Sequence, residues 1–442
     1  MKYWSKLAAP LFGMALAVTA PASVQAQPQE QFIPLPSYRV GPFGGGGASL
    51  FGGMIDYLNL VNAKGGINGV KIVYEECETE YNTSRGVECY ERLKNKYGGA
   101  SLMETGSTGI AYALLDRLPQ DKIPMTTVGY GRSDAADGRV FPWVFPLIST
   151  YWSQAAVMVK YLGDQVGGMQ NLKGKKIVDL YHDSAYGKES FPVLDHYAKE
   201  LGFELIKIPV PSPGIEQQSQ WIQIRQSKAD YVILWGFGVM NAAALKAAAR
   251  IGYPREQIIG SWWAGSEVDT VPAGDAAKGY LSMSYTAPGS FPVIDEIKKT
   301  LYDAGKGNLD KDTMFANVSH VRGLVVGIMM TEAVRAAQER YGKGKVMTAE
   351  QVRWGYENLN LDEGRQKAIG AFGLFPPMKT TCLDHEGSGA TMVQQWDGTK
   401  FVRKSAGWIQ GDRALVRKLA EQSAAQYAAE KKITPRDCSK EH

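Results

Sequence analysis

The chain has 442 residues, 44% hydrophobic and 21% charged, which is enough for two or three soluble globular domains. Its formal net charge is +4, from 49 basic and 45 acidic residues, and no basic cluster is interleaved with aromatic residues. Nothing in this balance favours nucleic acid, so we expect no nucleic-acid partner.

The first residues have the three-part layout of a secretory signal peptide. Two lysines precede or border an apolar run at residues 7–20, and the small residues Val24 and Ala26 stand at the spacing of a cleavage site. We therefore expect residues 1–26 to be a signal peptide and the mature protein to act in the periplasm. An N-terminal anchor helix is the alternative, although the run is short for a bilayer.

Short apolar runs then alternate with helical patterns. A first series of strands and helices is predicted at residues 70–74, 83–97, 102–105, 110–118 and 123–128, and a second at 176–181, 188–201, 203–210, 216–227, 231–235, 242–251 and 257–262. Repeated strand–helix units require a parallel sheet covered by helices. Two series, joined near residues 145–151, predict an α/β protein with two doubly wound parallel-sheet lobes.

Three elements follow the second series. Residues 314–341 predict a long helix, residues 391–403 a β-hairpin turning at Asp397-Gly398, and residues 412–432 an Ala-rich charged helix. Open α/β sheets bind ligands at the carboxyl ends of their strands, so two facing lobes would share a cleft there. Hinge closure around a ligand is a known behaviour of this architecture.

Four cysteines are present, at positions 77, 89, 382 and 438. No CxxC occurs and no histidine stands at a metal-ligand spacing from them, so we expect no metal site. Disulfides are expected in an oxidising compartment, and three pairings are open. We favour Cys77 with Cys89, because a strand end and the next helix can approach closely.

Four segments resemble, in order, those of the leucine/branched-chain amino-acid binding proteins of ABC transporters, which are type I periplasmic binding proteins. The segments are NAKGGINGVKI at 62–72, DSAYGKE at 183–189, KADYVILWGFGVMNAAALKAAARIGYP at 228–254 and VQQWDGTKFV at 393–402. The resemblance implies a multi-crossover hinge. It places residues 27–148 plus 285–378 in lobe one and 149–284 plus 379–442 in lobe two.

The same resemblance implies a function. The chain would be the periplasmic solute-binding component of an ABC importer, binding a small organic solute between the lobes without catalysis or a cofactor. Its partners would be that solute and an ABC permease of the inner membrane, and shuttling between them favours a monomer.

The resemblance also points to site residues in lobe one. Ser107 and Thr108 match a helix start that holds a ligand carboxylate through hydroxyl and N–H groups, which suits the positive end of a helix dipole. A plain helix cap is the alternative. In the next loop, Thr127 and Tyr130 are further candidates, and Tyr130 could stack on a ligand. Arg132 is either a partner for a ligand carboxylate or an ordinary surface charge. The family usually carries smaller residues near Tyr130.

In lobe two, Tyr186 and Phe237 match aromatic walls of the family site, with core packing as the alternative for Phe237. Amino-acid binders place a glutamate near the position of Trp262 to receive the ligand ammonium, and this chain has none there. An unpaired ammonium is costly in a closed cleft. We therefore favour an organic or aromatic acid over a branched-chain amino acid or amide, unless Glu267 or Asp269 reaches the cleft.

A secreted enzyme and a ligand sensor are the alternative functions. A secreted enzyme is disfavoured, because the glycine run 44–47 lacks the GK[ST] of a phosphate loop and no G-x-S-x-G or H-E-x-x-H occurs. A periplasmic ligand sensor of the same fold stays open, since fold alone does not choose between a permease and a receptor.

Overall fold

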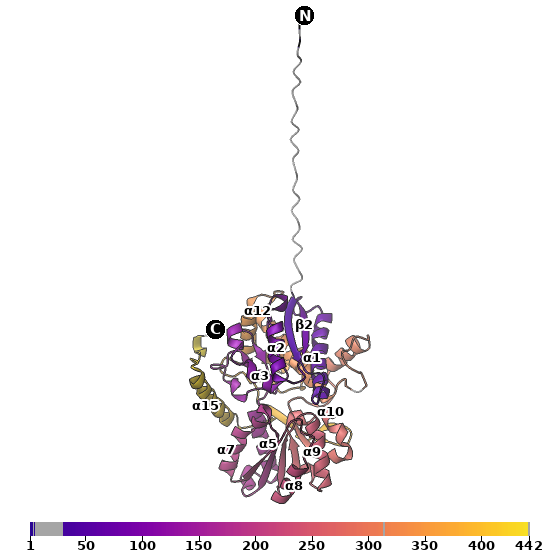
Figure 1. Cartoon of the computed structure of the whole chain (residues 1–442), viewed down its shortest axis with the longest axis vertical. Helices are drawn as coiled ribbons and strands as arrows, with labels where there is room; N and C mark the ends of the chain where they lie inside the picture. Colours follow the sequence, from indigo (N-terminus) through magenta and orange to yellow (C-terminus); the bar gives the residue numbers. More distant parts are fainter. Residues whose placement is uncertain (3, 5–29, 313, 441–442) are drawn as a thin grey trace.

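The computed structural model describes residues 1–2, 4, 30–312 and 314–440, so the expected signal peptide at 1–26 lies almost entirely outside the described residues. The described chain folds into two α/β lobes placed end to end (Figure 1). Among the described helices, none has the length and apolar character needed to cross a membrane.

Lobe one is built on short parallel strands. They are β1 (Glu30–Ser37), β2 (Lys71–Glu78), β3 (Met103–Glu104), β4 (Met125–Thr126) and β5 (Val144–Phe145), with the small antiparallel pair β11 (Asn360–Leu361) and β12 (Met378–Lys379). β1 pairs with β2 on one side and lies beside β3 on the other, where the Ser101 amide donates to the Phe32 carbonyl at 3.2 Å. Pro34 and Pro36 have no N–H to donate, so the ladder towards β3 is interrupted. The spatial order is β2-β1-β3-β4-β5.

Lobe two repeats this order in one larger sheet. Its parallel strands run β7-β6-β8-β9-β10 and continue into the antiparallel strands β13 and β14, with β15 paired to β13. The bounds are β6 (Lys176–His182), β7 (Glu204–Val210), β8 (Tyr231–Trp235), β9 (Ile258–Gly260), β10 (Leu281–Ser284), β13 (Ala390–Trp396), β14 (Phe401–Arg403) and β15 (Ile409–Gln410). The predicted hairpin at 391–403 is therefore confirmed, and so are two doubly wound lobes.

Helices surround both sheets (Figure 1). With lobe one lie α1 (Gly44–Ala63), α2 (Thr83–Leu93), α3 (Thr108–Leu114), α4 (Leu118–Asp121), α11 (Pro292–Ile297), α12 (Val318–Tyr341), α13 (Ala349–Glu357) and α14 (Glu363–Ala368). With lobe two lie α5 (Tyr151–Gln165), α6 (Ala185–Lys188), α7 (Phe191–Leu201), α8 (Gln218–Ser227), α9 (Val239–Arg250) and α10 (Glu267–Thr270). The last helix, α15 (Arg413–Lys431), runs along one side of both lobes.

The glycine run 44–47 has a packing role. It opens α1, and a Cβ on Gly47 would lie 1.8 Å from the carbonyl oxygen of Tyr38 at the end of β1. Farther along α1, a Cβ on Gly53 would lie 2.0 Å from the carbonyl oxygen of His320 in α12. Only glycine permits such close contact between backbones, so the run serves strand–helix and helix–helix packing.

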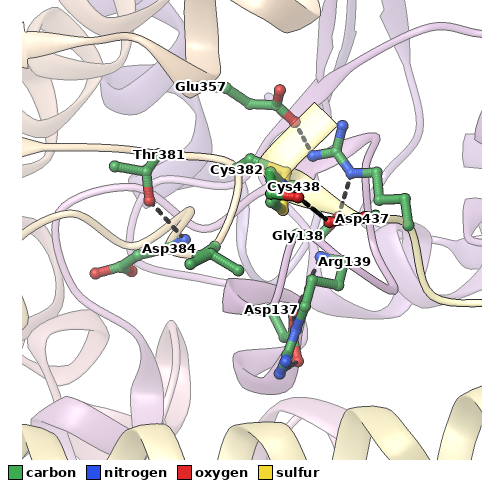
Figure 2. The surroundings of a disulfide bond; sticks show 12 residues. Asp137, Gly138, Arg139, Glu357, Thr381, Cys382, Asp384, Asp437 and Cys438 are labelled. Atoms are coloured by element: carbon green, nitrogen blue, oxygen red, sulfur yellow. Dashed lines mark hydrogen bonds and ion pairs between the residues drawn. A yellow bond between two sulfur atoms is a disulfide. The ribbon is translucent and has the colours of Figure 1, made fainter. Parts of the chain in front are cut away.

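Two disulfides occur in the described chain. Cys77 at the end of β2 is bonded to Cys89 in α2, which confirms the pairing that we favoured. Cys382 is bonded to Cys438, 56 residues later, so the C-terminal tail is held beside Glu357 and Gly138 of lobe one (Figure 2). The tail thus returns to lobe one, whereas the resemblance places all of 379–442 in lobe two. The division of the chain into lobes stays a prediction.

Several predicted elements differ from those observed. The helix expected over 83–97 ends at Leu93, and a separate 3-10 turn, in which Tyr97 has a left-handed φ of 50°, follows at Lys96–Gly98. Trp262 follows the end of β9 and begins a short 3-10 turn (Trp262–Ala264). β1, α1 and α5 were not among the predicted elements. Two prolines make the sequence of β1 unlike that of a typical strand, although seven of its eight residues are buried.

Candidate functional site

A small cavity, with room for about one water molecule, lies between the lobes, where the carboxyl ends of both sheets face each other. Lobe one contributes Tyr38 after β1, Tyr81 after β2, Gly106 and Thr108 after β3, and Tyr130 after β4. Lobe two contributes Tyr151 at the start of α5, Tyr186 in α6, Phe237 after β8 and Trp263 after β9. In each sheet the first strand of the series lies between the second and third. The cavity is beside this switch point in both lobes, where open sheets bind ligands.

The cavity lining is aromatic and uncharged. Five of the nine lining residues are tyrosines, and none carries a formal charge. Burial raises the pKa of Tyr151 and Tyr186 well above the usual range, so both hydroxyls stay protonated. The Tyr186 hydroxyl donates to the Gly236 carbonyl at 2.9 Å. Ring faces with a few neutral hydroxyls suit a solute that has a flat or apolar body and few polar atoms.

Tyr130 closes the lobe-one end of the cavity through its hydroxyl. That oxygen accepts from the amides of Thr105 at 3.0 Å and Gly106 at 2.9 Å, and it donates to the Thr126 carbonyl at 3.2 Å. Behind it, the buried carboxyl of Glu104 accepts a second bond from the Gly106 amide at 2.9 Å. Burial raises the pKa of Glu104 to about 7. The amides after β3 are therefore already bonded within the protein.

Four of the eight sequence-predicted site residues meet in the cavity lining, namely Thr108, Tyr130, Tyr186 and Phe237. Ser107 caps α3, its hydroxyl accepting from the Ile110 amide at 3.4 Å. Thr127 is buried outside the lining, and its hydroxyl has no bonded partner among the described residues. Whether these residues contact a ligand stays a prediction.

The structure does not bring Arg132 to the cavity. Its guanidinium makes two hydrogen bonds to Asp134, at 2.5 and 2.8 Å, and lies 4.4 Å from the ring centre of Tyr427 in α15. Phe141 flanks it at 5.2 Å. These contacts dock α15 on lobe one, so Arg132 is already paired and does not offer the free fork that we expected for a carboxylate.

Trp262 and Trp263 have different roles. Trp263 is the lining residue, while Trp262 is fully buried beside the cavity and stacks on Tyr151 at 5.6 Å. Both indole N–H groups donate to the carbonyl of Gly129, at 2.7 and 2.9 Å, so the pair fastens lobe two to the loop after β4. We predicted Trp262 as the aromatic wall of the site, and the residue that lines the cavity is its neighbour Trp263.

The cavity residues that sequence reasoning missed share one signal. Tyr38, Tyr81 and Trp263 lie within three residues after the end of a strand, and Tyr151 opens α5. An aromatic residue in such a place faces the cleft once both sheets are aligned. Tyr38 escaped notice because its strand, β1, was not recognised.

Side chains from the two lobes meet around the cavity. Phe43 and Tyr81 of lobe one contact Phe237 of lobe two, with ring centres 5.0 and 5.1 Å apart. At the other side, the buried carboxylate of Glu189 in lobe two accepts from the amide and hydroxyl of Ser133 at 3.1 and 2.6 Å, and from the Tyr112 hydroxyl. The lobes are therefore closed on each other in this structure.

No group of three or more metal-ligating side chains occurs among the described residues. Two sheets with matching strand order, closed over an aromatic cavity at their switch points, define a two-lobe solute-binding protein. Comparisons with known proteins make the assignment more specific.

The sequence model of the periplasmic binding protein family matches residues 30–400, and the chain belongs to this family. It is a family of solute-binding proteins. Leu/Ile/Val-binding protein homolog 8 of Brucella abortus is 28% identical over 222 residues, 50% of this chain and 54% of that protein. The match thus spans about half the length of this curated relative.

Solved structures extend the likeness to nearly the whole chain. A protein named as an ABC transporter permease from the Pseudomonas fluorescens group is 47% identical, covers 93% of this chain and 100% of its own, and has a TM-score of 0.87. A Thermus thermophilus branched-chain amino acid transporter protein with bound valine is 21% identical, covers 88% of this chain and 98% of its own, and has a TM-score of 0.74. An R. palustris solute-binding protein in complex with benzoate is 19% identical, covers 86% and 97%, and has a TM-score of 0.66. The predicted resemblance and the type I periplasmic-binding-protein fold are both confirmed.

Proposed function

We propose that this chain is the periplasmic solute-binding component of an ABC importer. It closes its lobes over one small organic solute, releases that solute unchanged to an inner-membrane permease, and performs no chemistry. The observation that carries the proposal is the aromatic cavity at the switch points of both sheets. Thr108, Tyr130, Tyr186 and Phe237 are proposed ligand contacts from the sequence, and Tyr38, Tyr81, Tyr151 and Trp263 join them from the geometry.

The cavity also bears on the solute. Its lining holds no carboxylate to receive an ammonium, and the two acids considered from the sequence are engaged elsewhere. Glu267 accepts from the Val318 amide at 2.8 Å, and Asp269 accepts from Asn241 and Ser266. We therefore favour an organic acid with a flat or apolar body over a free amino acid. In the closed protein the cavity has room for about one water molecule, so a solute would enter while the lobes are parted.

A thermal-shift screen tests this function. The panel contains aromatic acids, short fatty acids, branched-chain amino acids and amides. A bound solute raises the melting temperature with concentration, because it stabilises only the folded state. Each hit is then recovered and examined by NMR. A hit that returns chemically altered contradicts the binding-protein assignment, and leucine-like hits with silent acids contradict the choice of solute.

A further inference from the structure

A buried arginine beside the cavity lacks most of its hydrogen bonds. Arg322 belongs to α12 and is completely buried. Its Nε and Nη1 atoms have no bonded partner, and Nη2 donates one bond to the Gly265 carbonyl at 3.3 Å. A guanidinium can donate five hydrogen bonds, and buried charges in proteins are as a rule paired. Arg322 therefore stands out among the buried charged groups of the described chain.

The nearby acids do not pair with it. Glu267 and Asp269 are close enough to act on Arg322 electrostatically, but their carboxylates accept hydrogen bonds from other groups, as described above. Burial accordingly lowers the pKa of the Arg322 guanidinium, although an arginine stays protonated in proteins. What surrounds the cation is aromatic: the ring centres of Trp263 and Tyr285 lie 5.6 and 5.5 Å from its Cζ atom.

Arg322 lies at the interface between the lobes. It is carried by α12 of lobe one, whereas Trp263 and Gly265 belong to the segment after β9 in lobe two. Trp263 also lines the cavity, so a single indole separates the cation from the ligand space. Parting of the lobes would carry Trp263 and Gly265 away and open Arg322 to the same cleft. The hydroxyl of Tyr285, next to the cation, is a further buried group without a bonded partner.

We propose that Arg322 is the anion-binding residue of the cleft and that the solute is held by a carboxylate on this guanidinium. The proposal rests on the binding function proposed above and deepens it, because it names the group that selects an acid. A carboxylate would accept a bond that Nε or Nη1 leaves unmade, and the neighbouring Nη2 would complete the fork geometry that arginine favours. The solute would then pair a charge that the protein by itself leaves unpaired.

Formate, the smallest carboxylate, serves as the probe, with formamide as its neutral counterpart. The melting temperature of ligand-stripped protein is measured in sodium formate and in sodium chloride of equal ionic strength. We expect formate to raise the melting temperature of the wild-type chain above that in chloride, and formamide to leave it unchanged. Absence of a formate effect in the wild-type chain overturns the proposal.

Two variants locate the effect. Arg322→Met keeps the length of the side chain without its charge, so it should abolish the formate response. Without ligand, its melting temperature should equal or exceed that of the wild type, because an unpaired buried charge has been removed. Arg322→Lys keeps a point charge without the fork, and its formate response should be reduced. If Arg322→Met does not fold, an undiminished response in Arg322→Lys refutes the proposal.

The matched control is Arg365→Met. Arg365 is paired with a carboxylate, through two hydrogen bonds to Glu332 at 2.6 and 2.7 Å. Its loss should lower the melting temperature of the unliganded protein and leave the formate response intact. A fall of the same kind in unliganded Arg322→Met, with its formate response retained, would show that Arg322 is structural. Neutral solutes from the panel that stabilise wild-type and Arg322→Met protein equally would refute this inference while leaving the binding function standing.

Discussion

At the scale of single residues, the role of a side chain in this protein depends on where it points as much as on its residue type. Trp262 and Trp263 are adjacent, identical, and bonded to the same carbonyl oxygen. One turn of 3-10 backbone nevertheless aims Trp263 into the cavity and Trp262 into the wall behind it, against Tyr151 and Tyr285. Their substitution should therefore give different phenotypes.

We expect Trp262→Ala to reduce the free energy of unfolding by about 3–5 kcal/mol, because it removes a fully buried indole and leaves a cavity. Trp263→Ala should weaken solute binding strongly, with a smaller loss of stability, because one face of its ring borders ligand space. Chemical denaturation and calorimetric titration with a screen hit distinguish the two. Equal losses of affinity with little loss of stability would contradict this division.

At the scale of elements, α15 acts as a strap between the lobes. Near its start, Arg413 pairs with the buried Glu386, which accepts the Thr150 amide at the beginning of α5. Near its end, Lys431 pairs with Asp116 of lobe one. The tail beyond it is fixed by the disulfide between Cys382 and Cys438 (Figure 2). Both ends of α15 are thus anchored.

Removal of this disulfide should loosen the strap. The bond closes a loop of 56 residues, and chain entropy assigns to it a stabilisation of up to about 4 kcal/mol. We expect Cys382→Ser/Cys438→Ser to lower the free energy of unfolding and to raise amide hydrogen exchange at the end of α15 and in the tail. Exchange in β6 to β10 should not change. Cys77→Ser/Cys89→Ser is the control, since it should leave exchange in α15 unaltered.

At the scale of the whole molecule, lobe closure buries polar groups as well as rings. Glu189 is the clearest case, since this residue of lobe two accepts hydrogen bonds from Tyr112 and Ser133 of lobe one. Arg132 and Asp134 are the charged groups facing this carboxyl. Burial raises the pKa of Glu189 to about 7 from its ordinary 4.5. An opened cleft would return the carboxyl to water and to its ordinary pKa.

Closure should therefore weaken as pH rises. A group whose pKa is higher in the closed state holds its proton more tightly there, so the contribution is complete below about pH 4.5 and is lost towards about pH 7. We expect the dissociation constant of a screen hit to increase about tenfold or more over this window in the wild type. In Glu189→Gln the increase should be absent.

Glu200→Gln, an exposed change on α7, provides the control and should retain the wild-type pH profile. Small-angle scattering at the two ends of the window reports the lobe separation directly. An unchanged pH profile in Glu189→Gln would assign the dependence to other groups.

The amino-acid sequence by itself determined the architecture and the family. Alternating strand and helix patterns, as at residues 176–181 and 188–201, are local and periodic, so they are legible without a structure. The hairpin at 391–403 and the Cys77–Cys89 bond followed from short-range geometry in the same way. Four of the eight predicted site residues line the cavity because they follow strand ends.

Only the tertiary structure determined which side chains line the cleft. Arg132 pairs with Asp134, two residues along, and packs on Tyr427 of α15, which is distant in the sequence. Trp263, and not Trp262, lines the cavity. Arg322 carried no signal in a helix that reads as core, and its missing partners appear only when both lobes are in place. Side-chain direction and pairing depend on long-range packing, and local patterns do not encode long-range packing.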